Sequence, residues 1–320
     1  MLNIQKSLYT IIQEVWIFVK NDFHLPAYLY AFTIATIGIV VRYNTDFYDR
    51  ACIWGFNNDS LWWMNILFYT TVYLLTAIPT LLMRGHGHTL HNPHFWIKSL
   101  VCIIIYAVYT GYIGHWKWNF STLSYQEQYY LKLIIGQSKG IVLMLLPLAL
   151  LKVVYDRHEP GLYGLRRSSK LLDGYMALYL MLLPFLIGIS FTSDFLQAYP
   201  QFRLWNFDHM FGWPTWLVGI SYEVPYAFDF IMTEVLFRGA LVIGMAALLG
   251  RDAVIPMIVM YVSIHFGKPW METYSSLFGG YILGALAYQT RHIWGGVIVH
   301  MGIAITMEIM GFIQYYCGWR

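Results

Sequence analysis

Residues 216–249 read WLVGISYEVPYAFDFIMTEVLFRGALVIGMAALL, an apolar run that contains only four charged side chains. A helix of about 17–25 apolar residues is long enough to cross a bilayer. This run is longer than one crossing, so we expect its beginning to lie at the membrane interface, with Pro225 in the first turn of the spanning part. The stretch therefore predicts a helix inside a membrane, and its few charges mark the positions to examine first.

The composition of the whole chain agrees with a membrane protein. Of 320 residues, 58% are hydrophobic and 12% are charged, compared with about 45–50% and about 25% in soluble domains. A soluble globule of this kind would expose large apolar patches, which excludes a soluble enzyme, a nucleic-acid binder and a disordered regulator. The net charge of +3 is too small to indicate a polyanionic partner, and three distant cysteines suggest no disulfide framework.

Similar low-charge runs recur along the chain, and they predict an all-α, polytopic transmembrane bundle of about eight or nine spans. The amphipathic stretch 8–19 is typical of a helix lying in the interface. We expect an N-terminal part, 1–170, with this helix and about four spans, and a C-terminal bundle, 171–320. The predicted spans are 25–41, 61–83, 95–115, 133–151, 171–191, 216–249, 253–266, 277–289 and 293–313.

The distribution of Lys and Arg predicts the orientation. The connection 152–170 holds five basic residues, and basic loops stay on the cytoplasmic side. We therefore place this loop and the N-terminus inside, and the 192–215 loop outside. The protein is expected to be an integral, multi-pass component of a bacterial cytoplasmic membrane.

Four polar residues in the C-terminal part call for a functional explanation, because a charge at bilayer depth costs at least about 2.5–3.5 kcal/mol. Glu234 and Arg238 are four residues apart and share a helix face; the simplest interpretation is a structural ion pair. His265 and His300 occur on later segments. A carboxylate and two imidazoles from three helices are able to activate water. They also form a known zinc ligand set, although no HExxH spacing supports a metal.

These residues resemble the CAAX prenyl endopeptidase and bacteriocin-processing (CPBP) intramembrane proteases. The family motifs are Glu-Glu-x-x-x-Arg, Phe-x-x-x-His and His-x-x-x-Asn. Here they correspond to residues 233–238 (TEVLFR), 261–265 (YVSIH) and 300–304 (HMGIA). Order and spacing agree, and the resemblance covers about residues 215–312.

The resemblance implies an intramembrane endopeptidase in which Glu and His activate water and the third motif stabilises the oxyanion. It assigns Glu234 as general base or as the group that orients it, and Arg238 as the residue that fixes the ionisation of Glu234. His265 would share the water, and His300 would stabilise the oxyanion. A divalent metal such as zinc, held by Glu234, His265 and His300, or no cofactor at all, is compatible with the family.

Two motif positions differ from the family pattern. Thr233 replaces the first Glu, and Ala304 replaces the Asn of the third motif. Three explanations stay open: Glu234 acts as the single carboxylate and base, paired to His265; Asp229 one turn earlier supplies the lost carboxylate; or proteolysis has been lost and the fold serves as a scaffold or chaperone. A transporter lined by Asp229, Glu234 and Arg238 is a further alternative.

From these observations we predict a peptidase that cuts a membrane-associated peptide or protein, with the lipid bilayer as its environment and no nucleic-acid partner. Two other features receive the simpler interpretation. The segment 84–94 carries four histidines, but Gly85, Gly87 and Pro93 favour a solvated loop over a metal site, and we expect no acidic or cysteine ligand to join them. The terminal Cys-Gly-Trp-Arg places a cysteine at the prenylation position, yet Gly318 and Arg320 do not fit that motif.

Overall fold

The computed structural model describes residues 4–53, 61–157, 161–168, 171–207 and 209–318. These residues are mostly helical, and no named strand occurs among them. Its helices are α1 Ile4–Asp22, α2 Leu25–Asn44, α3 Leu61–Met83, α4 Pro93–Gly111, α5 Tyr125–Ser138, α6 Leu146–Tyr155, α7 Leu172–Ile189, α8 Ser193–Ala198, α9 Thr215–Glu234, α10 Ala246–Leu249, α11 Val254–Ser263, α12 Trp270–Thr290 and α13 Trp294–Tyr316, with short 3₁₀ and π segments between them.

Seven helical stretches among the described residues are long and apolar enough to cross a membrane. One of them, Thr215–Ser263, has 49 residues and includes both α9 and α11; at 1.5 Å per residue it is far longer than one bilayer crossing. α12 has 21 residues and a more polar composition. The polytopic helical bundle predicted from the sequence is confirmed, and the protein is an integral, multi-pass membrane protein.

Local sequence signals set several helix boundaries. Asn92 accepts a hydrogen bond from the backbone of His94, and Pro93 occupies the first turn of α4, where its missing N–H costs nothing. Ser124 and Glu127 form a capping box at the start of α5. Gly250 adopts a positive φ of 56°, a conformation that glycine reaches without strain, and there the chain reverses from α10 into α11.

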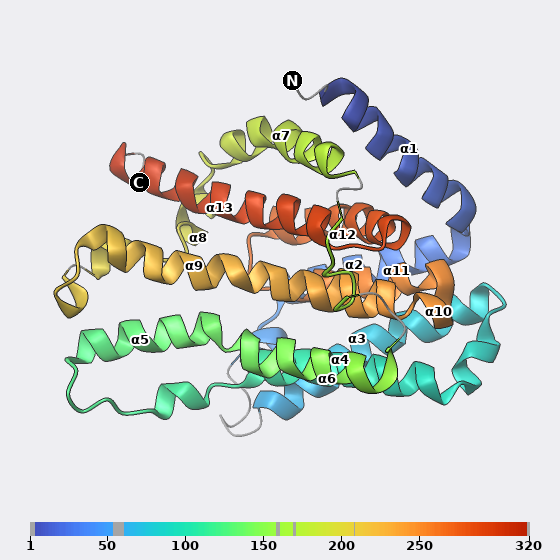
Figure 1. Cartoon of the computed structure of the whole chain (residues 1–320), viewed down its shortest axis with the longest axis horizontal. Helices are drawn as coiled ribbons and strands as arrows, with labels where there is room; N and C mark the ends of the chain where they lie inside the picture. Colours follow the sequence, from blue (N-terminus) through green and yellow to red (C-terminus); the bar gives the residue numbers. More distant parts are fainter. Residues whose placement is uncertain (1–3, 54–60, 158–160, 169–170, 208, 319–320) are drawn as a thin grey trace.

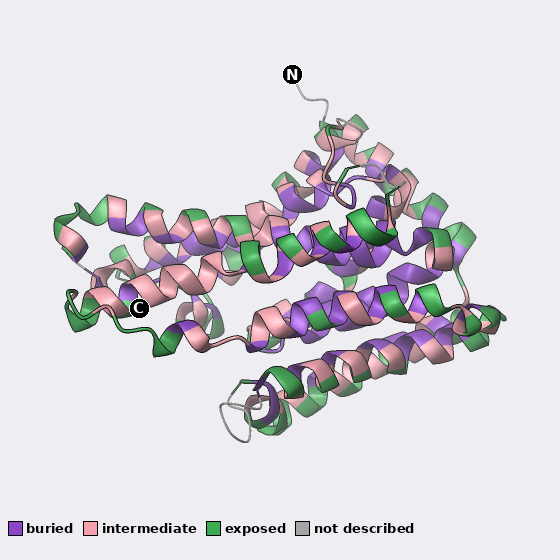
Figure 2. Ribbon diagram, turned by 60° about the horizontal axis from the view of Figure 1, so that its bottom comes forward, coloured by how far each residue is buried: buried purple, intermediate pink, exposed green. Residues whose placement is uncertain are grey.

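The long helices lie side by side. Figure 1 shows α13, α9 and α5 running nearly parallel to one another, with α7 along the outer side of α13. Figure 2 shows the buried residues gathered on the surfaces where helices face one another, while exposed residues follow the outer faces. Many exposed residues are large and apolar, including Leu67, Leu150 and Val224, as expected for helices that face lipid.

One hydrophobic core joins the two predicted parts of the chain. Tyr73 and Phe95 from the N-terminal part and Phe237 and Tyr261 from the C-terminal part belong to the same buried cluster. α1 packs on α7 and α12 and leaves Trp16 65% exposed, which suits an interfacial helix. The division at residue 170 stays a prediction, because nothing in the structure tests it.

Candidate active site

The first part of the site is a buried ion pair at the junction of α9 and a π-helix. Glu234 is the last residue of α9, and the π-helix η8 follows from Val235 to Gly244. Arg238 Nη1 lies 3.0 Å from Glu234 Oε1, and both side chains are fully buried. π-helical turns inside longer helices are frequent at functional sites. The sequence prediction that these two side chains pair is confirmed by this distance.

α13 supplies the second part, because a glycine lets it approach Glu234. A Cβ atom at Gly296 would lie 2.1 Å from Glu234 Oε2, so only glycine leaves room for the carboxylate. One helical turn further on, His300 Nδ1 lies 3.0 Å from Glu234 Oε1. The carboxylate therefore contacts Arg238 and His300 at the same oxygen atom.

Tyr261 of α11 connects the two histidines. Its hydroxyl lies 3.3 Å from His300 Nε2, and its backbone carbonyl is 2.9 Å from His265 Nδ1. The Arg238 guanidinium lies 3.9 Å from the centre of the Tyr261 ring, within the range of a cation–π contact. The imidazole rings of His265 and His300 are 6.3 Å apart between centres and are inclined by 29°.

The four residues singled out from the sequence therefore meet in one place, with one difference in their pairing. The open interpretation in which Glu234 pairs with His265 is not what the structure shows: Glu234 contacts His300, and His265 binds the carbonyl of Tyr261. Tyr261 was visible only as the first residue of the second motif. Its hydroxyl, which joins the two parts of the site, was not anticipated.

The substituted motif positions and Asp229 lie outside these contacts. Asp229 accepts a hydrogen bond of 2.8 Å from Tyr109 of α4, so its carboxylate is engaged on another side of α9. Ala304 belongs to a cluster of buried aromatic side chains that includes Tyr130 and Phe202. Thr233 is buried, with 8% exposure. No second carboxylate accompanies Glu234 in the contacts that these described residues make.

The donor atoms of the site do not fit a metal ion as they stand. Both nitrogens of His300 face protein partners, and Glu234 is held by Arg238. Within the part of the chain that the structure describes, no group of three His, Cys, Asp or Glu side chains is arranged to hold a metal. We therefore derive no chemical step through a metal, and the metal stays an untested prediction.

Several buried polar atoms of the site have no hydrogen-bond partner. They are Glu234 Oε2 and the Nε, Nη1 and Nη2 atoms of Arg238; Nη1 is near Glu234 but is not aligned for a hydrogen bond. Buried polar groups are nearly always satisfied, and the exceptions call for an explanation. These atoms are hydrogen-bond donors and acceptors that no protein group satisfies in the part of the chain that the structure describes.

The N-terminal helices hold the loop that carries His265. At the end of α2, Arg42 donates to the carbonyl of Phe266, and the Tyr43 hydroxyl lies 2.7 Å from Thr273 Oγ1. Thr273 in turn donates to the carbonyl of His265 at 2.5 Å. No sequence signal marked Arg42 and Tyr43, because they follow an ordinary apolar run and lie more than 200 residues before their partners.

A tyrosine of the 161–168 segment holds the π-helix that carries Arg238. Tyr163 is fully buried, and a Cβ at Gly239 or Gly244 would lie 2.5 or 2.7 Å from it. Its hydroxyl donates to Asp156 at 2.8 Å, and Lys98 donates to both Asp156 and the carbonyl of Gly244. Residues that lie outside the three motif segments thus position η8.

The histidine-rich segment takes part in a separate polar cluster. Arg84 Nη1 lies 2.7 Å from Asp22 Oδ1 and 2.8 Å from Asp252 Oδ1, and His86 Nδ1 contacts the other oxygen of Asp252. Residues Gly87–His91 form a 3₁₀ helix. The expectation that no acidic residue joins these histidines was wrong, because Asp252 reaches His86 from 166 residues away.

Comparison with known families agrees with this geometry. Residues 211–306 match the family model described as type II CAAX prenyl endopeptidase Rce1-like, which confirms the resemblance drawn from the three motifs. The matched segment includes Glu234, Arg238, Tyr261, His265 and His300. The chain is thus a multi-pass membrane protein with a CAAX-protease-like C-terminal segment. No curated protein and no solved structure matches it.

Proposed function

We propose that the protein is an intramembrane endopeptidase, located in a bacterial cytoplasmic membrane, that hydrolyses a peptide bond of a membrane-associated peptide or protein. The observation that supports this most directly is the 3.0 Å contact between Glu234 and His300, made by side chains 66 residues apart in a buried setting. A structural ion pair of Glu234 and Arg238 needs no imidazole. The added histidines supply proton-transfer groups.

His265 takes the proton of the attacking water in this mechanism. Its Nδ1–H donates to the Tyr261 carbonyl, so the neutral ring keeps a lone pair on Nε2. A water bound between His265 and His300 gives a proton to that nitrogen as its oxygen attacks the peptide carbonyl carbon. The same nitrogen then returns the proton to the leaving amine, as a general acid.

His300 and Tyr261 stabilise the oxyanion. With Nδ1–H donating to Glu234, His300 presents Nε2–H to the developing negative charge. The Tyr261 hydroxyl is a second donor in the same place, 3.3 Å from Nε2. Ala304 has no polar side chain. The Tyr261 hydroxyl therefore serves as the hydrogen-bond donor that the Asn of the family motif would supply at this position. Arg238 holds the Glu234 carboxylate in position through a direct charge contact of 3.0 Å.

The experiment is a cleavage assay in proteoliposomes with fluorescence-quenched peptides that carry a C-terminal alkyl anchor. Glu234→Gln and His265→Ala should each abolish cleavage. Asp229→Asn is the matched control, since it alters a buried carboxylate on the same helix that bonds Tyr109 instead. Cleavage that survives both Glu234→Gln and His265→Ala, or that is lost equally in Asp229→Asn, contradicts the proposal.

Loss of catalysis is the second candidate, and Thr233 and Ala304 favour it. On that interpretation the wild-type protein cleaves no anchored peptide and binds a membrane partner. The variant Thr233→Glu/Ala304→Asn then gains cleavage while the wild type has none. Robust cleavage by the wild type rejects this candidate.

A further inference from the structure

An open pocket on the surface, called the cavity below, lies on the opposite face of α13 from the active site. Its volume is about 460 Å³, and its walls are Leu165, Arg166, Arg167, Ser168, Leu172, Trp294 and Ile298. Two residues along a helix differ by about 200° in direction. Trp294 and Ile298 therefore face away from Gly296 and His300, which contact Glu234 or lie beside it. The cavity does not belong to the active site.

The polar end of this cavity is positively charged. Arg166 and Arg167 line it, and none of the described residues in its wall is acidic. α7 begins at Leu172 and α13 at Trp294, so the positive ends of two long helices also border it. Asp173 lies in the first turn of α7 but is not part of the wall. The field in the cavity favours an anion.

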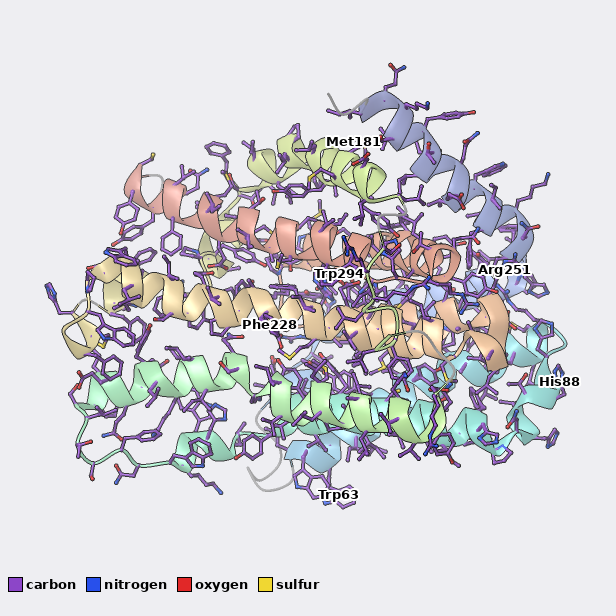
Figure 3. All side chains as sticks on the ribbon, in the orientation of Figure 1. Trp63, His88, Met181, Phe228, Arg251 and Trp294 are labelled. Atoms are coloured by element: carbon purple, nitrogen blue, oxygen red, sulfur yellow. The ribbon has the colours of Figure 1, made fainter. Side chains whose placement is uncertain are left out.

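The rest of the wall is apolar and firmly placed. Leu165, Leu172 and Ile298 are aliphatic, and the Trp294 indole donates from Nε1 to the Arg166 carbonyl at 2.9 Å. Arg166 Nε donates to the Arg291 carbonyl at 3.1 Å. Figure 3 labels Trp294 where the 161–168 segment crosses the helices. An anionic group with an attached apolar chain matches a cavity of this kind better than a free ion does.

The position of the cavity favours one class of anion. Leu172 and Trp294 are the first residues of two candidate membrane-spanning helices, so the cavity is at the depth of lipid headgroups. Basic pockets between spanning helices on the cytoplasmic side bind anionic headgroups, and the basic 152–170 loop is expected on that side. We propose that this cavity binds the phosphate of an anionic phospholipid, with the acyl chains leaving along α7 and α13.

The proposal is independent of peptidase activity, and lipid binding tests it directly. Delipidated protein in detergent is titrated with phosphatidylglycerol, phosphatidylcholine or glycerol phosphate, and bound ligand is counted by native mass spectrometry. We expect phosphatidylglycerol to bind, and Arg166→Gln/Arg167→Gln to weaken it by about tenfold. Arg157→Gln is the matched control, because Arg157 belongs to the same loop, bonds the Val153 carbonyl and does not line the cavity.

A single substitution, Arg167→Gln, distinguishes a loss of lipid binding from a loss of folding. Arg167 is exposed, so Arg167→Gln leaves the hydrogen bonds of Arg166 and Trp294 in place and should still weaken phosphatidylglycerol by about threefold. Equal binding of phosphatidylcholine, equal binding of glycerol phosphate without acyl chains, or an equal loss in Arg157→Gln each overturns the proposal.

Discussion

Two buried charge clusters in this protein differ in how completely their polar atoms are paired. In the cluster of Asp22, Arg84 and Asp252, both terminal nitrogens of the arginine donate to carboxylates. In the cluster of Glu234, Arg238 and His300, the arginine makes a charge contact, but none of its nitrogens makes a hydrogen bond. A paired cluster stabilises a fold. An incompletely paired one calls for another explanation, which the proposed activity supplies.

The largest expected effect tests whether Glu234 and His300 act as one unit. Each of Glu234→Gln and His300→Ala should lower kcat/KM by about 10²–10⁴-fold. The double variant should lose no more than the worse single one, because groups that act together are not additive. The measurement is anchored-peptide cleavage in proteoliposomes. Multiplicative losses in the double variant show that the two residues work separately.

A substitution in the cluster of Asp22, Arg84 and Asp252 should lower stability and leave activity unchanged. Asp252→Asn removes a charge from Arg84 and should lower the free energy of unfolding by about 3 kcal/mol, while activity per folded molecule stays the same. Thermal unfolding in detergent measures the change. Asp46→Asn, in the exposed pair with Arg50, is the control and should leave the midpoint unchanged. A selective loss of activity in Asp252→Asn contradicts the distinction between the clusters.

Tyr261→Phe separates the oxyanion donor from the packing of the ring. The phenyl ring retains the contacts with Arg238 and Phe237 and loses only the hydroxyl. Removal of one oxyanion donor costs about 10²–10³-fold in kcat, with KM little changed. Adding Ala304→Asn should restore part of the rate if the two donors serve the same oxyanion. An unchanged kcat in Tyr261→Phe removes the tyrosine from the mechanism.

The smallest effect concerns the support of the His265 loop. Tyr43→Phe removes hydroxyl contacts with Thr273 Oγ1 and the Lys268 carbonyl. One hydrogen bond contributes about 1 kcal/mol, so kcat/KM should fall by about fivefold. Tyr30→Phe on the same helix, which loses a bond to Leu75, should have no effect on cleavage. Equal losses in the two variants indicate a general effect of α2 on stability.

The sequence predicted the residues of the site better than their pairing. Glu234 and Arg238 are four residues apart, so a regular helix already places them together. His265 and His300 were identified from the order of the motifs. That order predicts that their side chains lie close together, but it does not predict which atoms are in contact. The contact of Glu234 with His300 depends on Gly296, whose role is visible only when the helices are placed.

Contacts between distant segments were beyond any local pattern. Arg84 pairs with Asp22, 62 residues away, and with Asp252, 168 residues away. No periodic pattern in a single sequence extends over such separations. Most of the spans were predictable, because apolar length is a local property, but the predicted span 277–289 is not among the seven candidate spans and 253–266 is part of a longer stretch. The π-helix at Val235–Gly244 was not predictable, since no local pattern distinguishes it from an α-helix.

The burial of Tyr163 against Gly239 and Gly244 also bears on the order of assembly. Translation releases the tyrosine before the two glycines, so this contact can form only after the later helix has been made. We therefore expect a change in the 161–168 segment to slow the maturation of the helix that carries Arg238, although the segment is not part of that helix.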